Sequence, residues 1–200
     1  MKYNPDIQKR RSIRLRGYDY SSPGVYFITI CTFQKECFLG KIKIGQIELN
    51  DFGEIVEREW EKSFQIRKEI RYDSYVIMPN HLHGIIIIVG ARGSTPNNID
   101  LQNKKADIPN NTGLVNIKNR VNCHLPLQMK PKSLSSFVAG FKSNVSRKIG
   151  FSIWQRNYYE HIIRDEKELN KYRQYIKNNP SKWDEDEENP NKIGIYNENK

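Results

Sequence analysis

The sequence predicts an α+β domain in which one antiparallel sheet carries helices on one face. Two runs rich in β-branched and aromatic residues, 25–33 (VYFITICTF) and 81–89 (HLHGIIIIV), have the composition of buried strands. Two further stretches, 51–64 and 133–149, carry apolar residues at helical spacing. The order strand, hairpin, helix, two strands, helix is most simply that of a ferredoxin-like, RRM-like sandwich.

Local signals place the N-terminal elements. The turn at 22–24 (SPG) opens the first strand, and the alternation within 38–49 predicts short strands or a hairpin. A helix is expected to begin at Asp51, with Glu54 completing a capping box. Two strands, 75–78 and 81–89, are then expected to follow.

Two more helices are expected in the C-terminal half. The first begins at Ser133 and stops at Gly150, because glycine readily adopts the left-handed conformation that ends helices. The second is capped by Asp165 and should end near Asn179, because the residue before Pro180 avoids helical geometry.

Charge and periodicity divide the chain into segments. We expect a basic N-terminal arm (1–23), one folded domain (24–183) and an acidic, polar tail (184–200). Residues 91–132 lack periodicity and are interpreted as a flexible insertion in the domain. Runs of like charge are commonly solvated, and the acidic tail is expected to be so.

Composition narrows the class of protein. The chain has 33 Lys and Arg against 23 Asp and Glu, a net charge of +10, which favours a polyanionic partner such as nucleic acid. Its three cysteines form no CxxC pair, which indicates a reducing compartment and no structural zinc site. No apolar stretch follows the charged start, so we expect a cytoplasmic protein without a signal peptide.

A His-Leu-His triplet opens the most apolar strand. Alternate residues of a strand share a face, so His81 and His83 should project together while Leu82 points into the core. Three interpretations stand: incidental histidines, a zinc site, or a two-histidine site for a divalent cation that an oxygen ligand completes. The zinc interpretation lacks an evident set of further Cys or His ligands.

The last helix offers both an oxygen ligand and a nucleophile. Tyr175 and Asn179 are four residues apart and therefore lie on one helical face. The Asn179 amide oxygen can bind a hard cation, and the Tyr175 phenol can act as a nucleophile.

Two motifs carry a resemblance to a known family. Residues 75–83 (YVIMPNHLH) resemble the core motif of the IS200-like superfamily of single-tyrosine, His-hydrophobic-His (HUH) transposases. Residues 154–164 (WQRNYYEHIIR) and 175–180 (YIKNNP) resemble the REP-associated tyrosine transposase branch of that superfamily. The similarity spans 24–183 without the insertion, which would make this stretch an IS200-like catalytic domain.

The resemblance implies an activity and a set of site residues. It implies that Tyr175 attacks single-stranded DNA, leaving a 5′-phosphotyrosine link and a free 3′-hydroxyl, and that rejoining reverses this step. It also implies that His81, His83 and Asn179 hold Mg²⁺ or Mn²⁺. Many relatives have Gln as the third ligand, so Asn179 is a modest departure that suits the REP-associated branch.

The same resemblance implies a DNA partner that folds as a hairpin, an imperfect palindrome with a short single-stranded guide. A monomer is favoured over a dimer, and a nucleoid-associated location is expected. Phosphate contacts are expected from basic side chains of the N-terminal arm, of the 133–149 helix and of the 154–156 segment. These are Arg10, Arg11, Arg14, Arg16, Lys142, Arg147, Lys148 and Arg156.

Two alternatives stay open from the sequence. One is a catalytically silent, domesticated relative that binds a DNA hairpin without cutting it. The other is an RNA-binding ferredoxin-like module, which predicts stacking aromatics on the open face of the sheet.

Overall fold

A four-stranded antiparallel sheet organises the molecule, whose computed structural model describes residues 19–89 and 132–192. The sheet has the order β4-β5-β1-β6 and consists of β1 (Gly24–Cys31), β4 (Ile70–Ile77), β5 (His81–Ile88) and β6 (Tyr159–Ile163). A separate hairpin pairs β2 (Gly40–Lys43) with β3 (Gln46–Leu49). The helices are α1 (Asp51–Ile66), α2 (Leu134–Ile149) and α3 (Glu166–Asn178), with 3₁₀ segments η1 (Phe33–Lys35) and η2 (Pro180–Glu185).

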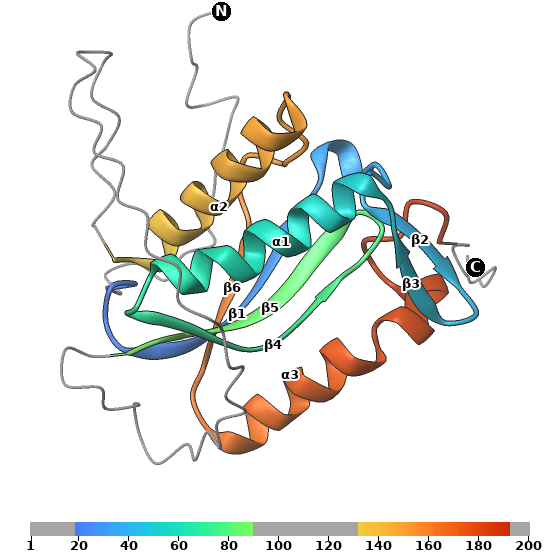
Figure 1. Cartoon of the computed structure of the whole chain (residues 1–200). Helices are drawn as coiled ribbons and strands as arrows, with labels where there is room; N and C mark the ends of the chain where they lie inside the picture. The colour runs from blue at the N-terminus through green and yellow to red at the C-terminus, as the bar shows by residue number, and fades with distance from the viewer. Residues whose placement is uncertain (1–18, 90–131, 193–200) are drawn as a thin grey trace, which may run out of the picture.

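Helices cover both faces of this sheet. Figure 1 shows α1 and α2 together on one face and α3 on the other. The core divides accordingly: Trp60 and Phe137 of the first pair pack against Leu82, whereas Leu169 and Ile176 of α3 pack against residues such as Ile85. The predicted α+β fold is confirmed, and its βαββαβ order is that of the ferredoxin-like sandwich. The structure also shows that the C-terminal helix α3 lies on the face of the sheet opposite to α1 and α2.

Most predicted boundaries lie close to the observed ones. α2 is capped by Ser133 and ends at Gly150, whose φ of 96° is left-handed as expected. α1 begins at Asp51 as predicted, but its cap is Asn50, whose side chain accepts hydrogen bonds from two backbone N–H groups of the first turn. β6 was not predicted, because five residues are too few to establish a period of two.

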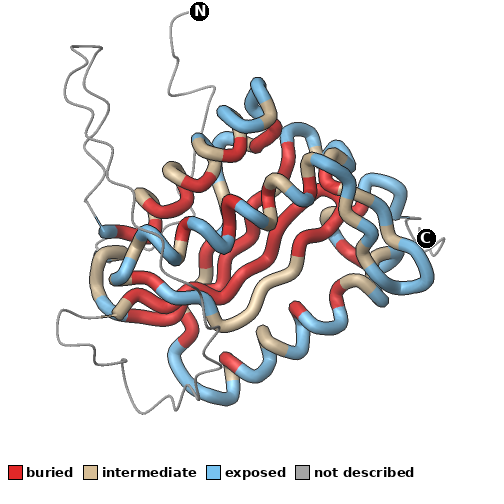
Figure 2. Tube along the Cα trace, viewed as in Figure 1, coloured by how far each residue is buried: buried red, intermediate tan, exposed pale blue. Residues whose placement is uncertain are grey.

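Strand β5 is buried along its whole length, as Figure 2 shows for the centre of the sheet. It pairs with β1 on one side and β4 on the other, so both its edges are hydrogen-bonded. Leu82 and Ile86 face α1 and α2, and His81 and His83 face the side that α3 covers. The predicted orientation of Leu82 into the core is confirmed.

Two side-chain contacts fix α3 to the sheet. Both guanidinium nitrogens Nε and Nη2 of Arg173 bind the carboxylate of Asp73, at 2.8 and 2.6 Å. Asp73 lies where the pairing of β4 with β5 shifts register, between Tyr72 and Tyr75. At the start of α3, Glu168 lies 2.6 Å from the His161 Nε2 on β6. The face of α3 that carries Tyr175 is thereby held against the sheet.

Some sequence predictions lie outside the described residues. These are the basic arm up to residue 18, the 91–132 insertion apart from Lys132, and the part of the tail from residue 193 to residue 200. In the two described ranges, no helix has both the length and the apolar character needed to cross a membrane.

Replacing Gly84 by alanine should destabilise the fold. A Cβ at this position would lie 2.7 Å from Cζ2 and 2.9 Å from Cη2 of the Trp60 indole, which is fully buried and cannot move aside. We expect Gly84→Ala to lower the free energy of unfolding by about 1–3 kcal/mol, measured by urea denaturation.

Gly140→Ala is the matched control. A Cβ at Gly140 of α2 would meet only an Arg67 guanidinium nitrogen, at 3.6 Å. Alanine also favours the helical conformation, so this variant should gain roughly 0.5–1 kcal/mol. Equal effects of the two substitutions would contradict the steric explanation.

Candidate active site

The two histidines of β5 lie side by side on a buried surface. His81 is 0% exposed and His83 is 2% exposed, and their ring centroids are 4.4 Å apart. Strand alternation places both rings on one face of the sheet, as the sequence predicts, and the structure shows that α3 covers this face. Buried polar rings need partners, and these partners determine what each ring nitrogen can do.

Asn80 determines the tautomer of His81. The Asn80 side-chain NH₂ donates to two backbone carbonyls, those of Lys35 at 2.9 Å and Glu188 at 2.6 Å. Its amide oxygen must therefore accept, and it lies 2.8 Å from Nδ1 of His81. Nδ1 carries the proton, and Nε2 is left with a lone pair. Within the described part of the chain, this buried Nε2 has no hydrogen-bond partner.

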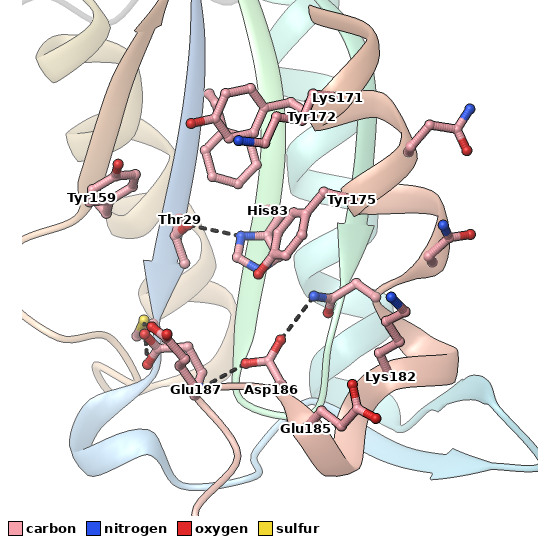
Figure 3. A pocket seen from close by; sticks show the side chains of 16 residues that line it. Thr29, His83, Tyr159, Lys171, Tyr172, Tyr175, Lys182, Glu185, Asp186 and Glu187 are labelled. Atoms are coloured by element: carbon pink, nitrogen blue, oxygen red, sulfur yellow. Dashed lines mark hydrogen bonds between the residues drawn. The ribbon is translucent and has the colours of Figure 1, made fainter. Parts of the chain in front are cut away.

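His83 has a partner on each ring nitrogen. Its Nδ1 lies 2.8 Å from the Thr29 hydroxyl on β1, the residue directly across the strand pair. Its Nε2 lies 3.2 Å from the Tyr175 hydroxyl. Figure 3 shows the His83 ring between Thr29 and Tyr175, so strand β1 and helix α3 approach the same imidazole.

Two oxygen-bearing side chains complete the cluster. The Asn179 NH₂ donates to Oδ2 of Asp186 at 2.9 Å, which leaves the buried Asn179 Oδ1 without a partner among the residues described. Asp186 also accepts from the Glu188 backbone N–H at 2.7 Å and is itself 8% exposed. Ligand atoms of His81, His83 and Asp186 all lie within 4.8 Å of one another.

This donor set suits a divalent cation. Neutral imidazole nitrogens, an amide oxygen and a carboxylate are ligands that Mg²⁺ and Mn²⁺ accept. Unsatisfied polar atoms are costly in a protein interior, and two of them, His81 Nε2 and Asn179 Oδ1, are buried here. A bound cation would satisfy both atoms.

Burial keeps both histidines neutral. It lowers the pKa of His81 from 6.5 to about 4, even though the nearby carboxylates of Asp186 and Glu188 oppose this shift. Burial also places the pKa of His83 well below its usual value, and the neighbouring His81 adds to the effect. Neutral rings are the form that binds metal ions, so the site needs no deprotonation near neutral pH.

Tyr175 is the most accessible member of the site. Its side chain is 43% exposed on α3. Burial, followed by the charges of Asp186 and Glu187, raises the pKa of Tyr175 to about 12, and a hydrogen bond with Asn179 partly offsets these effects. Its phenol is therefore protonated in this structure.

The structure brings together the four residues predicted for the chemistry, His81, His83, Tyr175 and Asn179. Two of the predicted DNA contacts lie on the other side of the sheet from this cluster. Arg147 and Lys148 are exposed on α2, across the sheet from α3, and Arg156 is exposed in the segment before β6. Arg10, Arg11, Arg14 and Arg16 lie outside the described residues.

Lys142, also predicted to contact DNA, has intramolecular partners in the structure. Its ammonium donates to the backbone carbonyls of Gln155 at 2.7 Å and Asn157 at 2.8 Å, and burial lowers its pKa to about 8. The side chain thus holds the segment before β6 against α2, and a phosphate contact would compete with both hydrogen bonds.

Asp186 is the main residue that the sequence did not reveal. It belongs to the acidic run 184–188, and the expectation that this run is solvated is wrong for Asp186. The 3₁₀ segment η2 turns the chain directly after Pro180 and returns it toward the histidines. The nearest sequence signal was the position of this acidic run, immediately after the helix with Tyr175 and Asn179. Thr29 and Asn80, which orient the two rings, carried no signal of their own.

Acidification should destabilise the metal-free protein. Because burial lowers the pKa of both histidines in the folded state, the unfolded chain takes up protons first as the pH falls below about 6.5. The free energy of unfolding should fall between pH 6.5 and about 4, by about 1.4 kcal/mol per pH unit for each histidine. Urea denaturation in EDTA measures this slope. His81→Gln should make it shallower, and an unchanged slope would contradict the assignment.

Comparison with known proteins gives both a structural likeness and a relative in sequence. The fold resembles that of a REP-associated tyrosine transposase that was solved bound to a REP hairpin. The TM-score is 0.53 at 18% identity, over 86% of this chain and 74% of that one.

No protein-family model matches the sequence. An uncharacterized protein of Haemophilus influenzae (strain Rd) is 43% identical over 192 residues, which cover 93% of this chain and 96% of the relative. This chain belongs to the same family as that Haemophilus protein.

Proposed function

We propose that this protein is a metal-dependent endonuclease and strand transferase for single-stranded DNA, a transposase that acts at hairpin-forming repeats. Tyr175 is the nucleophile, and the product of cleavage is a 5′-phosphotyrosine link. His81, His83 and Asn179 hold Mg²⁺ or Mn²⁺, and we add Asp186 to this set.

One observation carries the proposal. The Tyr175 hydroxyl lies 3.2 Å from Nε2 of His83, although the two residues are 92 positions apart in the chain. The same helix brings Asn179, one turn after Tyr175, to the same cluster through its bond with Asp186. A phenol beside a buried, neutral histidine pair and two oxygen ligands is suited to attack on a phosphodiester.

The cleavage step balances without a further reactant. The Tyr175 oxygen attacks phosphorus, the O–P bond to tyrosine forms, and the bond from phosphorus to the 3′-oxygen breaks. The tyrosine proton passes to solvent, and the leaving 3′-oxygen takes up a proton from solvent to become a hydroxyl. A cation in the site would supply positive charge to the non-bridging phosphate oxygen. Rejoining needs no ATP because the phosphotyrosine bond conserves the energy of the phosphodiester.

The ring nitrogens of His83 limit what Tyr175 can do. Thr29 already binds Nδ1, so Nε2 is the nitrogen that can serve as a ligand. A single lone pair on Nε2 serves one partner at a time, so a cation bound to Nε2 would take the place of the Tyr175 hydrogen bond. The hydroxyl would then be free to turn toward a phosphate.

The fold supports hairpin DNA as the partner, because the transposase of the same fold was solved with a REP hairpin. The net charge of +10 agrees with a polyanion. The basic N-terminal arm and the exposed side chains of Arg147, Lys148 and Arg156 remain proposed phosphate contacts. We propose a monomer, with Tyr175 acting on DNA bound to its own chain.

Cation binding should stabilise the fold through the proposed ligands. At a Mn²⁺ concentration about 100 times the Kd, the free energy of unfolding should rise by about 2.7 kcal/mol. Thermal melts with Mn²⁺ and with EDTA measure this gain. His81→Ala and Asp186→Asn should reduce it. Glu48→Gln on the β2–β3 hairpin is the control and should retain it, because the exposed Glu48 carboxylate pairs with Lys41 and Lys43 and not with the cluster. A gain that survives His81→Ala would show that the cation binds elsewhere.

Removing the Tyr175 hydroxyl should abolish cleavage and leave DNA binding intact. The test incubates end-labelled single-stranded DNA from the flanks of the gene with protein and Mn²⁺, then resolves covalent adducts on a denaturing gel. Wild-type protein should form an adduct, and Tyr175→Phe should form none. Tyr72→Phe is the matched control, because Tyr72 is 40% exposed and lies on β4 away from the site.

Two results would redirect the assignment. An adduct that persists in Tyr175→Phe would mean that another tyrosine is the nucleophile. Hairpin binding by the wild type without any adduct would instead favour the catalytically silent, DNA-binding alternative.

A further inference from the structure

A cavity of about 780 Å³ extends from the catalytic residues along α3. Its walls come from β1, the first residue of β6, α3 and the η2 segment, as Figure 3 shows. This volume lies within the range of about 300–1,000 Å³ that is typical of small-molecule sites. The proposed chemistry uses only the end with His83 and Tyr175, so the remainder of the cavity has no assigned ligand.

The cavity exists because α3 covers only part of its face of the sheet. The helix contacts β4 and β5. The neighbouring strip formed by β1 and β6 is left to line the cavity, with Phe27 and Thr29 from β1 and Tyr159 from β6. This strip lies directly beside the imidazole of His83, because Thr29 pairs with both His83 and Tyr159 across the strands.

The end of the cavity away from the cation site is aromatic. Phe27 forms its base and stacks on Tyr172, with ring centroids 4.3 Å apart and planes 24° apart. Phe27 also stacks on the His83 ring at 5.3 Å. Tyr159 meets Phe27 edge-on at 6.4 Å and is 45% exposed. We call the group of Phe27, Tyr159 and Tyr172 the aromatic pocket.

Tyr159 contributes little to the fold for so large a side chain. It is the first residue of β6, an edge strand of five residues, and nearly half of its surface is open to solvent. In the described ranges its hydroxyl makes no hydrogen bond. An exposed aromatic ring at the mouth of a cavity is a surface on which a flat ligand can stack.

Carboxylates gather at one end of the cavity. Glu185, Asp186, Glu187 and Glu188 line the end near the cation site, where they disfavour a phosphate that lacks a cation. Lys182 lies beside these carboxylates, whereas Lys171 lies at the aromatic end beside Tyr172, as Figure 3 shows. Aromatic rings beside a lysine are a combination that binds single-stranded nucleic acid, through base stacking and phosphate pairing.

We propose that the aromatic pocket binds one unpaired nucleobase of the DNA strand, adjacent to the phosphate that Tyr175 attacks. The base stacks on Tyr159, and Lys171 pairs with the backbone beside it. This inference rests on the proposed function, and it adds that the strand is held by a base contact as well as by the cation site. Duplex DNA cannot use the pocket, because its bases are stacked and paired, so the contact selects single-stranded DNA at the point of cleavage.

Fluorescence of 2-aminopurine tests the proposal without relying on turnover. The flanking single-stranded DNA used above carries 2-aminopurine at one position at a time, and it is titrated with Tyr175→Phe protein so that the strand stays intact. Stacking on an aromatic ring quenches this fluorophore. We expect quenching at one position next to the cleavage point. The quenching should be retained when Tyr159→Phe is added to the Tyr175→Phe protein, and it should be lost when Tyr159→Ala is added instead. The affinity of Tyr159→Ala should fall roughly 5- to 150-fold, the range that corresponds to the loss of one base stack.

Two controls keep the result interpretable. Tyr72→Ala removes a ring of similar exposure from β4, where Tyr72 packs against Phe64 and Tyr75, and it should leave the quenching unchanged. Tyr159→Leu retains bulk without aromaticity, so it should lose the quenching even if Tyr159→Ala fails to fold.

The outcomes separate this proposal from the proposed function. If wild-type protein forms the adduct but Tyr159→Leu quenches and binds like the parent protein, the aromatic pocket is overturned and the catalytic assignment stands. If quenching depends on Tyr159 but no adduct forms, the pocket stands and the catalytic assignment fails.

Discussion

The register of strand β5 is the constraint on which the rest of the site depends. Both edges of β5 are paired and both of its faces are buried, so its alternation cannot shift by one residue without exchanging Leu82 and Ile86 for His81 and His83. Gly84 belongs to the same pattern, because the indole of Trp60 occupies the space of a side chain there. The packing of α1 and α2 on one face thus fixes the position of both histidines on the other.

Burial then gives the histidines their chemical character. Desolvation lowers the pKa of both rings, and Asn80 holds the proton of His81 on Nδ1, so Nε2 points to the site with its lone pair available. The Asn80 amide is itself oriented by backbone carbonyls, one of which belongs to Glu188. The acidic segment after α3 therefore orients a histidine through its backbone while Asp186 contributes a carboxylate to the same cluster. Among the described residues, His81 Nε2 and Asn179 Oδ1 are two buried atoms without a hydrogen-bond partner, and a cation in this cluster would bind both.

The parts of this site that depend on local periodicity could be predicted from the sequence. The shared face of His81 and His83 follows from the period of a strand, and that of Tyr175 and Asn179 from the period of a helix. The meeting of these two pairs was expected from the family resemblance rather than from the pattern itself. The sequence did not predict Asp186 as a site residue, because a run of acidic residues is commonly solvated. Asp186 is buried only because of the three-dimensional path of η2. The position of α3 on the second face depends on tertiary contacts such as Arg173 with Asp73, which no local pattern encodes.

The acidic segment has opposite effects on the proposed cation site and on the proposed nucleophile, Tyr175. Asp186 and Glu187 add negative charge to a cluster that already offers neutral nitrogen and amide oxygen ligands, which favours a divalent cation. The same charges, after burial, raise the pKa of Tyr175 to about 12 and so disfavour the phenolate. A cation among these carboxylates would cancel part of their field, and it would also displace the Tyr175 hydroxyl from Nε2 of His83. Under the proposed function, the weaker field would ease loss of the phenol proton and the released hydroxyl would be free to turn toward a phosphate, so cation binding and the reactivity of Tyr175 would be linked through electrostatics and one shared lone pair.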